Sequence, residues 1–525
     1  MRTLQNLETK KSGILTVSYK MFFILSMAYL VVPVVVFFFG WLKLHYAIIA
    51  ALLLGGAFFL SSRDSINDYK GNKLSEITMD IPVAFILVLI VLSLLLTVTF
   101  DIGEFVWGTT DHAFRRAIYR DLVDKSWPVV YDLTKQTNPV VNNFLPDVNV
   151  GFSYYFAFWM IPALIGKIFG FFIGNISLVL WSALGIFLTM LGMALFIKRA
   201  SYAVVFSYVF FSGLDIIPYL YFQSVGTKEW MWLEGYTQHI VYISNINDLL
   251  NVFNQCIPCW LIVILLMLSR NNRSVGLIGA LTFAYSPWAT IGMVPIAVYM
   301  LFKKDYEGCN NKLLLKNVFS LTNIVPAVVM LLIFAPFYMA NSNATSISGS
   351  TLSFYGSVPA FLGGYLFTIL VELVPIGILL FKDYRKSILF WVTMGTLLVM
   401  PFYKISGQND LTMRGSMPEF FVLTVMLASV ISNYIFKNKN SKAPRTSVQS
   451  LTMIGAVILL IAMSMVALQM LLIVVTSTFD GSERHNEDIY SLEDIRDEEY
   501  LDLIDEQFFV YDYEDTFFFK YLARK

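Results

Sequence analysis

Residues 21–41 read MFFILSMAYLVVPVVVFFFGW, an unbroken apolar run without a charged side chain. A helix that crosses the hydrocarbon core of a bilayer needs about 20 such residues. The run is too long for the core of a signal peptide, and it lacks a small-residue cleavage site. We therefore expect residues 21–41 to form a retained transmembrane helix.

The rest of the chain repeats this pattern. Of the 525 residues, 57% are hydrophobic and only 14% are charged, which is far from the composition of a soluble globular protein. The sequence therefore predicts an all-α polytopic membrane protein. Length and hydropathy indicate these clear spans: 21–41, 47–61, 81–100, 176–196, 201–222, 255–269, 316–339, 358–381, 387–403, 419–436 and 451–475.

Two further apolar segments are ambiguous. Residues 275–302 are broken at Ser286-Pro287, so they could form one long helix or two short helices folded as a hairpin. Residues 152–170 contain Pro162 and Lys167, so they could cross the membrane or lie at its interface. The distribution of lysine and arginine favours the hairpin for 275–302 and an interfacial position for 152–170.

With those choices and a cytoplasmic N-terminus, nearly all clusters of basic residues fall in cytoplasmic loops. About 13 crossings then result, within a range of about 11 to 14, and the C-terminus lies outside the cytoplasm. We expect a multi-pass protein of the cell membrane. Its long loops lie on the outer face: 101–150, 223–254, 340–357, 404–418 and the segment from 476.

Two regions of different composition are expected. Residues 1–475 form the membrane domain, in which 101–175 make a large outer loop with interfacial helices. Residues 476–525 carry 15 acidic and 5 basic side chains but end in an aromatic run at 517–521, which we expect to dock on the membrane domain. The nucleotide-binding pattern GxxxxGK[ST] is absent from the sequence, which argues against an ATP-driven pump, and we expect no nucleic-acid partner.

The loop 101–150 contains a stretch that predicts a helix starting at Thr109 or Thr110 and ending near Lys125. Asp111 would lie in its first turn, where the helix dipole keeps a carboxylate ionised. Such a carboxylate beside arginines suits a general base next to a phosphate. The simpler alternative is a surface ion pair between Asp111 and Arg115, four residues apart. We expect one apolar face and one polar face, with Arg116, Arg120 and Asp124 on the polar face.

The same loop resembles the GT-C class of membrane glycosyltransferases, specifically the bacterial type that uses polyprenyl-phosphate sugars. The resemblance rests on Asp111-His112, the following helix with Trp127-Pro128, and the aromatic segment Tyr154–Gly170 with its Pro162 and Lys167. It covers roughly residues 81–200, and the remaining chain only in topology.

The resemblance implies a function and a set of partners. The enzyme would transfer a sugar from a polyprenyl-phosphate carrier to an extracytoplasmic glycan, lipid or protein acceptor, in contact with membrane lipids. Asp111 matches the catalytic acidic position, and substrate-binding roles fall to nearby polar residues of the loop: His112, Arg115, Arg116, Arg120 and Lys167. Many family members have a second carboxylate where this chain has His112, which weakens the case for a hard divalent metal. A divalent cation stays open as a cofactor, and no metal ligands are assigned.

Other candidates lie outside this loop. Arg414 in the loop 407–418 could hold the carrier phosphate, or it could snorkel to lipid headgroups or pair with Asp410. The loop 223–254 combines aromatic residues with His239 in a pattern that suits sugar rings, although an interfacial aromatic belt explains it better. Asp215 is expected toward the outer half of a span, where ionisable groups are costly and usually functional.

Two rival functions remain. A transporter or flippase for lipid-linked saccharides would explain the many spans and Pro-broken helices, but the chain shows no internal repeat. A non-catalytic envelope-polymer assembly protein would use the outer loops only as binding surfaces. Cys256 and Cys259 have the spacing of a redox pair but start a membrane helix, so a redox role is disfavoured.

Overall fold

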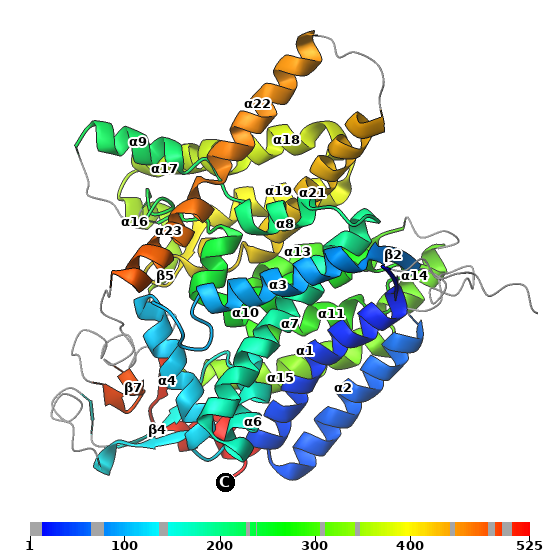
Figure 1. Cartoon of the computed structure of the whole chain (residues 1–525). Coiled ribbons are helices and arrows are strands. Elements are labelled where there is room, and N and C mark those ends of the chain that lie inside the picture. The colour runs from blue at the N-terminus through cyan, green and yellow to red at the C-terminus, as the bar shows by residue number, and fades with distance from the viewer. Residues whose placement is uncertain are drawn as a thin grey trace, which may run out of the picture.

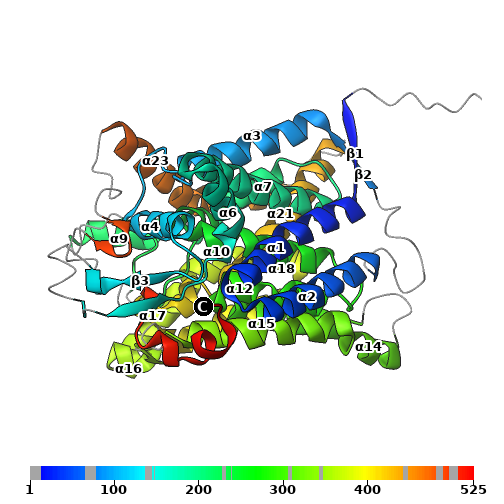
Figure 2. The same ribbon diagram turned by 90° about the horizontal axis from the view of Figure 1, so that it is seen from below.

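The computed structural model describes residues 13–64, 78–135, 145–146, 148–226, 232–237, 239–304, 310–341, 347–440, 447–480, 489–495 and 507–525. The chain is mostly helical, at 73%. This confirms the helical class expected from the sequence. Most helices run between two ends of the molecule, and Figures 1 and 2 place α4 at one end and β2 with α14 at the other.

The described residues contain eight helical stretches that are long and apolar enough to cross a membrane. They include α1 (Tyr19–Trp41), α2 (Leu44–Asp64), α7 (Phe171–Ile197) and α10 (Asn245–Leu268). The other four are Asn311–Met339 with α14 and α15, Val358–Tyr384 with α17 and α18, Asp410–Phe436 with α20 and α21, and Met453–Phe479 with α22 and α23. A membrane-embedded protein is therefore supported.

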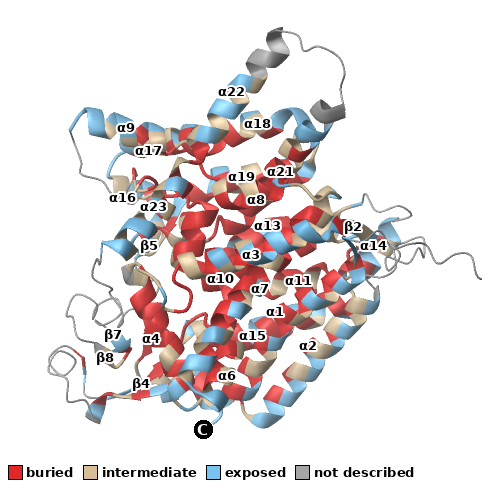
Figure 3. Ribbon diagram, in the orientation of Figure 1, coloured by how far each residue is buried: buried red, intermediate tan, exposed pale blue. Residues whose placement is uncertain are grey.

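Helix α10 is the central element. Of an 18-residue apolar stretch of α10, 94% is buried inside the molecule. The corresponding share in α2, at the periphery, is 28%. It packs against α7, α21 (Met417–Asn440), α8 (Ala203–Phe210) and α13 (Pro287–Phe302). Figure 3 shows the buried residues concentrated along this inner layer and the exposed ones on the outer helices. The free side chains of Cys256 and Cys259 are both buried in α10, as part of this core.

The remaining elements are helices of different lengths and short strands. The short helices are α3 (Val83–Thr99), α4 (Thr110–Asp124), α6 (Met160–Phe169), α9 (Ile216–Ser224), α11 (Val275–Ala280), α12 (Thr282–Tyr285), α14 (Asn311–Val318), α16 (Thr351–Tyr355), α17 (Val358–Thr368), α18 (Val374–Tyr384), α19 (Ile388–Val399) and α20 (Asp410–Met413). Three further helices are longer: α15 (Leu321–Met339), α22 (Ser447–Met463) and α23 (Met465–Phe479).

The strands form antiparallel pairs: β1 (Ile14–Ser18) with β2 (Thr78–Pro82), β5 (Ser348–Ser350) with β6 (Tyr403–Ile405), and β7 (Ile489–Ser491) with β8 (Asp494–Ile495). A three-stranded sheet has the order β3 (Val130–Asp132), β4 (Asn149–Phe152), β9 (Phe509–Val510).

The break expected at Ser286-Pro287 is present. Ser286 is extended, with φ −160° and ψ 112°, and its side chain accepts a hydrogen bond from the Ala289 amide. The segments before and after it fold back on each other, and α11 packs against α13. At the open end of this hairpin, the Asn272 side chain donates to the carbonyls of Met300 and Leu301 at 3.0 and 2.8 Å. This agrees with the hairpin alternative for residues 275–302. Residues 152–170 contribute a 3-10 turn, Ala157–Trp159, that leads into the ten-residue helix α6.

The single span expected at 201–222 is wrong. The segment breaks into α8 and α9, and the intervening residues 211–215 are not helical. The break is stabilised by a contact between distant segments, since the Leu214 amide donates to the Val371 carbonyl at 2.9 Å. Val371 lies in a π-helical turn, Ile369–Leu373, between α17 and α18. A hydropathy pattern carries no sign of such a contact.

The aromatic run near residue 520 docks on the membrane domain, as expected. Phe518 is fully buried, and its ring centroid lies 4.8 Å from that of Phe337 in α15. The Lys43 amide donates to the Leu522 carbonyl, and the Arg524 amide donates to the Trp41 carbonyl, both at 2.9 Å. The segment therefore closes over the turn between α1 and α2.

Candidate functional site

Helix α4 starts at Thr110, directly after the predicted capping residue Thr109. Thr109 is extended, with φ −70° and ψ 169°, and its carbonyl accepts a hydrogen bond from the His112 amide. The Thr109 hydroxyl donates to the Asn251 side chain in α10 at 3.1 Å instead of capping its own helix. The first turn of α4, which carries Asp111, is therefore tied to the central helix of the molecule.

Asp111 and Arg115 form an ion pair at 3.3 Å, between Oδ2 and Nη2. The two side chains differ greatly in exposure, at 48% for Asp111 and 6% for Arg115. Within the described part of the chain, Nε and Nη1 of Arg115 have no hydrogen-bond partner although both atoms are buried. The carboxylate is thus accessible from outside, while the guanidinium behind it keeps unused N–H groups.

Arg414 comes from a segment some three hundred residues further along the chain and reaches this region through Tyr155. Its Nη1 contacts Asp410 Oδ1 at 3.2 Å and donates to the Tyr155 hydroxyl at 2.7 Å. It also interacts electrostatically with Asp111 and Tyr154. We call Asp111, Arg115, Tyr154, Tyr155, Asp410 and Arg414 the Asp111 cluster.

The two tyrosines pack against each other, and Tyr155 contacts Arg414 while Tyr154 interacts with both arginines. Their ring centroids are 3.8 Å apart, and both residues follow directly after strand β4. Burial raises the pKa of Tyr154, and the positive charges of Arg115 and Arg414 act in the opposite direction. Both hydroxyls therefore stay protonated near neutral pH and can serve as hydrogen-bond donors.

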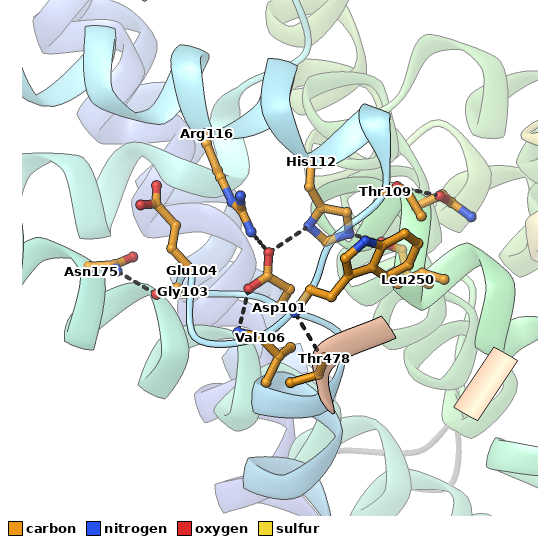
Figure 4. A network of polar contacts seen from close by, with 12 residues as sticks. Asp101, Gly103, Glu104, Val106, Thr109, His112, Arg116, Asn175, Leu250 and Thr478 are labelled. Atoms are coloured by element: carbon orange, nitrogen blue, oxygen red, sulfur yellow. Dashed lines mark hydrogen bonds and ion pairs between the residues drawn. The ribbon is translucent and has the colours of Figure 1, made fainter. Parts of the chain in front are cut away.

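Other predicted residues of α4 belong to a separate, buried network around Asp101 (Figure 4). The Arg116 guanidinium forms an ion pair with Asp101 Oδ2, and His112 Nδ1 lies 3.7 Å from the same oxygen. Asp101 is fully buried, and its Oδ1 accepts a hydrogen bond from the Val106 amide at 3.0 Å. Arg120 pairs with Glu104 at 2.6 Å.

Arg116, predicted on the polar face of α4, does not face solvent. Arg116 is only 5% exposed, as is Arg115, because the loop that carries Asp101 covers this face of the helix. His112 is also buried, and its Nε2 contacts the Leu250 carbonyl at 2.5 Å. Burial lowers the pKa of His112 to about 4, and the charge of Arg115 adds to the lowering. Lys167 lies at the far end of α4, where its Nζ donates to the carbonyls of Val123 and Lys125.

Asp215 lies in a different cluster, made of buried acids. It is 1% exposed and interacts with Glu372, which is 3% exposed and lies in the π-helical turn. The Tyr236 hydroxyl donates to Glu372 at 2.8 Å. Glu234 is near enough to Asp215 to interact with it, and burial raises the pKa of Glu234 to about 8. We call Asp215, Glu234 and Glu372 the acid cluster.

A line of amides runs from the acid cluster to Thr109, at the start of α4. Glu234 accepts hydrogen bonds from the Ser244 amide, at 2.6 Å, and from the Asn247 side chain. Asn251 donates to Asn247 Oδ1 at 2.5 Å and accepts from Thr109, at the start of α4. The loop 223–254 thus reaches the start of α4 through its last residues and through α10.

The backbone of His239 contacts a neighbour of the Asp111 cluster, while its ring contacts other residues. Its carbonyl accepts a hydrogen bond from Asn409 at 2.8 Å, next to Asp410, whereas its ring contacts Lys404 Nζ at 2.9 Å. The rings of Phe354 and Tyr355 lie against it. In the residues that the structure describes, no group of three or more His, Cys, Asp and Glu side chains is arranged to hold a metal ion.

Sequence reasoning did not identify Asp101, Glu104 or Tyr155 as parts of this region. Asp101 and Glu104 adopt left-handed backbone conformations, with φ 56° and 63°, which a sequence pattern does not reveal. Tyr154-Tyr155 was noticed only as part of an aromatic segment. Its proximity to Arg414 depends on the packing of segments far apart in the chain.

Comparison with protein-family models, with curated proteins and with solved structures gives no match for this chain. An accessible carboxylate, two guanidinium groups and two phenol hydroxyls can accept a proton from one group while they bind an anion next to it.

Proposed function

We propose that this chain is an integral-membrane glycosyltransferase of the GT-C type, which transfers a sugar from a polyprenyl-phosphate carrier to an extracytoplasmic glycan, lipid or protein. The observation that carries the proposal is that Arg414, from a distant segment, donates to Tyr155, whose ring packs on Tyr154 close enough to the Asp111–Arg115 pair to interact with it. The proposal includes about 13 crossings, a cytoplasmic N-terminus and an outward-facing Asp111 cluster.

In this mechanism, a hydroxyl oxygen of the acceptor attacks the anomeric carbon of the donor. The bond between that carbon and the phosphate oxygen breaks, and Asp111 takes the hydroxyl proton. Arg115 and Arg414 stabilise the negative charge that develops on the leaving polyprenyl phosphate, since guanidinium groups bind phosphate through paired N–H donors. Tyr154 and Tyr155 provide neutral donors to the same phosphate.

The substitution Asp111→Asn tests the assignment of the base. We expect sugar transfer from radiolabelled decaprenyl-phosphate hexoses to fall by about 10²- to 10⁴-fold, with donor binding unchanged. Asp124→Asn is the matched control, since Asp124 is an exposed carboxylate at the other end of the same helix. Transfer by the Asp111→Asn chain at the rate of the control would refute the role of Asp111.

A second candidate, a proton-coupled transporter for lipid-linked saccharides, is supported by the acid cluster. Asp215 and Glu372 are buried carboxyl groups that interact with each other, and two neighbouring buried carboxyl groups disfavour the state in which both are ionised. Ionisable groups inside a membrane domain are costly and usually mark a transport or relay path. A π-helical turn at Glu372 adds to this argument, because such turns often occur at functional sites.

The substitution Glu372→Gln separates the two candidates. A transporter would lose substrate movement driven by a pH gradient in proteoliposomes, whereas the glycosyltransferase would keep its sugar transfer. Asp111→Asn is expected to have the opposite pattern.

A further inference from the structure

A polar cavity lies at the end of the molecule opposite to the Asp111 cluster. It has a volume of about 780 Å³ and is lined by the start of α1, strand β2, and the last residues of α7 and α10. Figures 1 and 2 both show β2 and α4 at opposite ends. The positive-inside distribution puts this end on the cytoplasmic side.

Three cations line the cavity: Lys198, Arg199 and Arg270. The cavity has one acidic residue, Asp80, whose carboxylate accepts a hydrogen bond from Thr16 at 2.7 Å. Within the described part of the chain, no salt bridge joins the three cations to an acid. Positive charge therefore exceeds negative charge around this cavity, which favours an anionic ligand.

Arg199 is held in position by its neighbours. Its guanidinium lies 3.9 Å from the centre of the Phe436 ring, and its Nη1 donates to the Ser432 carbonyl at 3.4 Å. A cation that is fixed by packing loses little conformational freedom when it binds an anion.

Lys198 has an unusual backbone. It follows the last residue of α7 in the left-handed region, with φ 58° and ψ 36°. Glycine is the ordinary residue at such a helix end, because a side chain there is strained. A lysine at this position is explained if its charge is used.

The cavity also has an apolar side. Leu195, Phe196, Met267 and Leu268 line it and are only half-buried. The Tyr19 hydroxyl donates to the Leu268 carbonyl at 3.3 Å and interacts with Arg270. Cations beside exposed apolar side chains suit a molecule with a charged head and a hydrocarbon chain rather than a small soluble anion.

We propose that this cavity binds the anionic phosphate headgroup of a membrane lipid, with Lys198 and Arg270 contacting the phosphate and Arg199 supporting it. The site is separate from the Asp111 cluster, so it does not depend on the proposed glycosyltransferase activity.

Cysteine protection in the full chain tests the proposal. Thr78→Cys, with Cys309→Ser, places an exposed thiol on the cavity wall, whereas Cys256 and Cys259 are buried. The rate of labelling by N-ethylmaleimide is compared in nanodiscs of phosphatidylcholine and of phosphatidylcholine with phosphatidylglycerol. We expect the anionic lipid to slow labelling by up to about 25-fold, since each of the two cations that contact the headgroup strengthens binding about fivefold.

Charge-removing variants give the decisive comparison. Lys198→Gln with Arg270→Gln should lose the protection, and Lys382→Gln with Arg385→Gln should keep it. The second pair removes the same charge from exposed positions at the end of another helix, α18, outside the cavity. Protection that survives the first pair, or is lost equally in both, would overturn the site.

Two further measurements separate the alternatives. Lys198→Gly should raise the melting temperature, because it relieves the left-handed strain, yet it should weaken protection. Full protection in this variant would show that Lys198 only caps α7 and would contradict the proposal. Millimolar inorganic phosphate in phosphatidylcholine nanodiscs should leave labelling unchanged, and protection as strong as that by phosphatidylglycerol would rule out a lipid as the specific ligand.

Discussion

Two carboxylate–arginine pairs involve neighbouring positions of helix α4, yet they have different environments. In the Asp101–Arg116 pair the carboxylate is fully buried, and in the Asp111–Arg115 pair it is 48% exposed. A buried pair is costly to separate, so it contributes to structure, whereas an exposed carboxylate can meet a substrate. Burial, rather than the identity of the two residues, therefore separates the structural pair from the candidate catalytic pair.

The largest expected effect comes from breaking the buried pair. Asp101→Asn keeps the shape of the side chain and tolerates the left-handed backbone, but it leaves Arg116 as a buried charge. We expect the free energy of unfolding to fall by about 3 to 5 kcal/mol. Thermal and denaturant unfolding in detergent would measure it. The same loss in Asp111→Asn, where less than about 0.5 kcal/mol is expected, would remove the distinction between the pairs.

The second effect concerns pH. Burial lowers the pKa of His112 from its usual 6.5 to about 4, so the unfolded chain binds more protons between these values. Stability from the neutral imidazole is present above pH 6.5 and is lost as the pH falls toward 4, by up to about 3 kcal/mol. Asp121, with a pKa raised by burial to about 6, titrates in the opposite sense.

The difference between the native chain and His112→Gln isolates the histidine, because Asp121 is present in both. We expect the native chain to lose more stability than the variant from pH 6.5 to pH 4. Parallel curves for the two chains would show that His112 is not held neutral by the fold.

The third effect tests the role of Arg414 in the Asp111 cluster. Arg414→Lys keeps the charge but cannot contact Asp410, Tyr155 and a phosphate with one planar group. We expect binding of polyprenyl phosphate to weaken about tenfold, which corresponds to about 1.4 kcal/mol. Equilibrium binding in nanodiscs measures it, and Lys404→Arg serves as a control near the same loop.

The smallest effect lies at the other end of α4, where Lys125 pairs with Glu493. Their side chains are 22% and 25% exposed, between the two extremes compared above. Glu493→Gln should lower the free energy of unfolding by at most about 1 kcal/mol, and high salt should reduce the difference further. A loss as large as that of Asp101→Asn would mean that exposure does not rank these pairs.

Hydropathy predicted most of the helical core, because apolar segments of membrane length are visible one at a time. It failed at 201–222, where a backbone contact with Val371 at a distant π-helical turn stabilises a break. Likewise, the sequence indicated Asp111 and Arg414 separately. It could not show that Arg116 is covered by the loop of Asp101, or that Tyr155 joins Arg414, since both depend on tertiary packing.

The closing contact between the turn after α1 and the segment near residue 521 has a consequence for biosynthesis. Lys43 Nζ donates to the Tyr521 carbonyl at 2.8 Å, across 478 residues of chain. The ribosome makes the turn early and its partner much later, so the intervening helices enter the membrane before this contact can form. Until then, the face of Phe337 that Phe518 covers stays open. A nascent chain at that stage exposes an aromatic surface at Phe337 to the chaperones and proteases of the membrane. Phe518 covers this surface once the last part of the chain has been made.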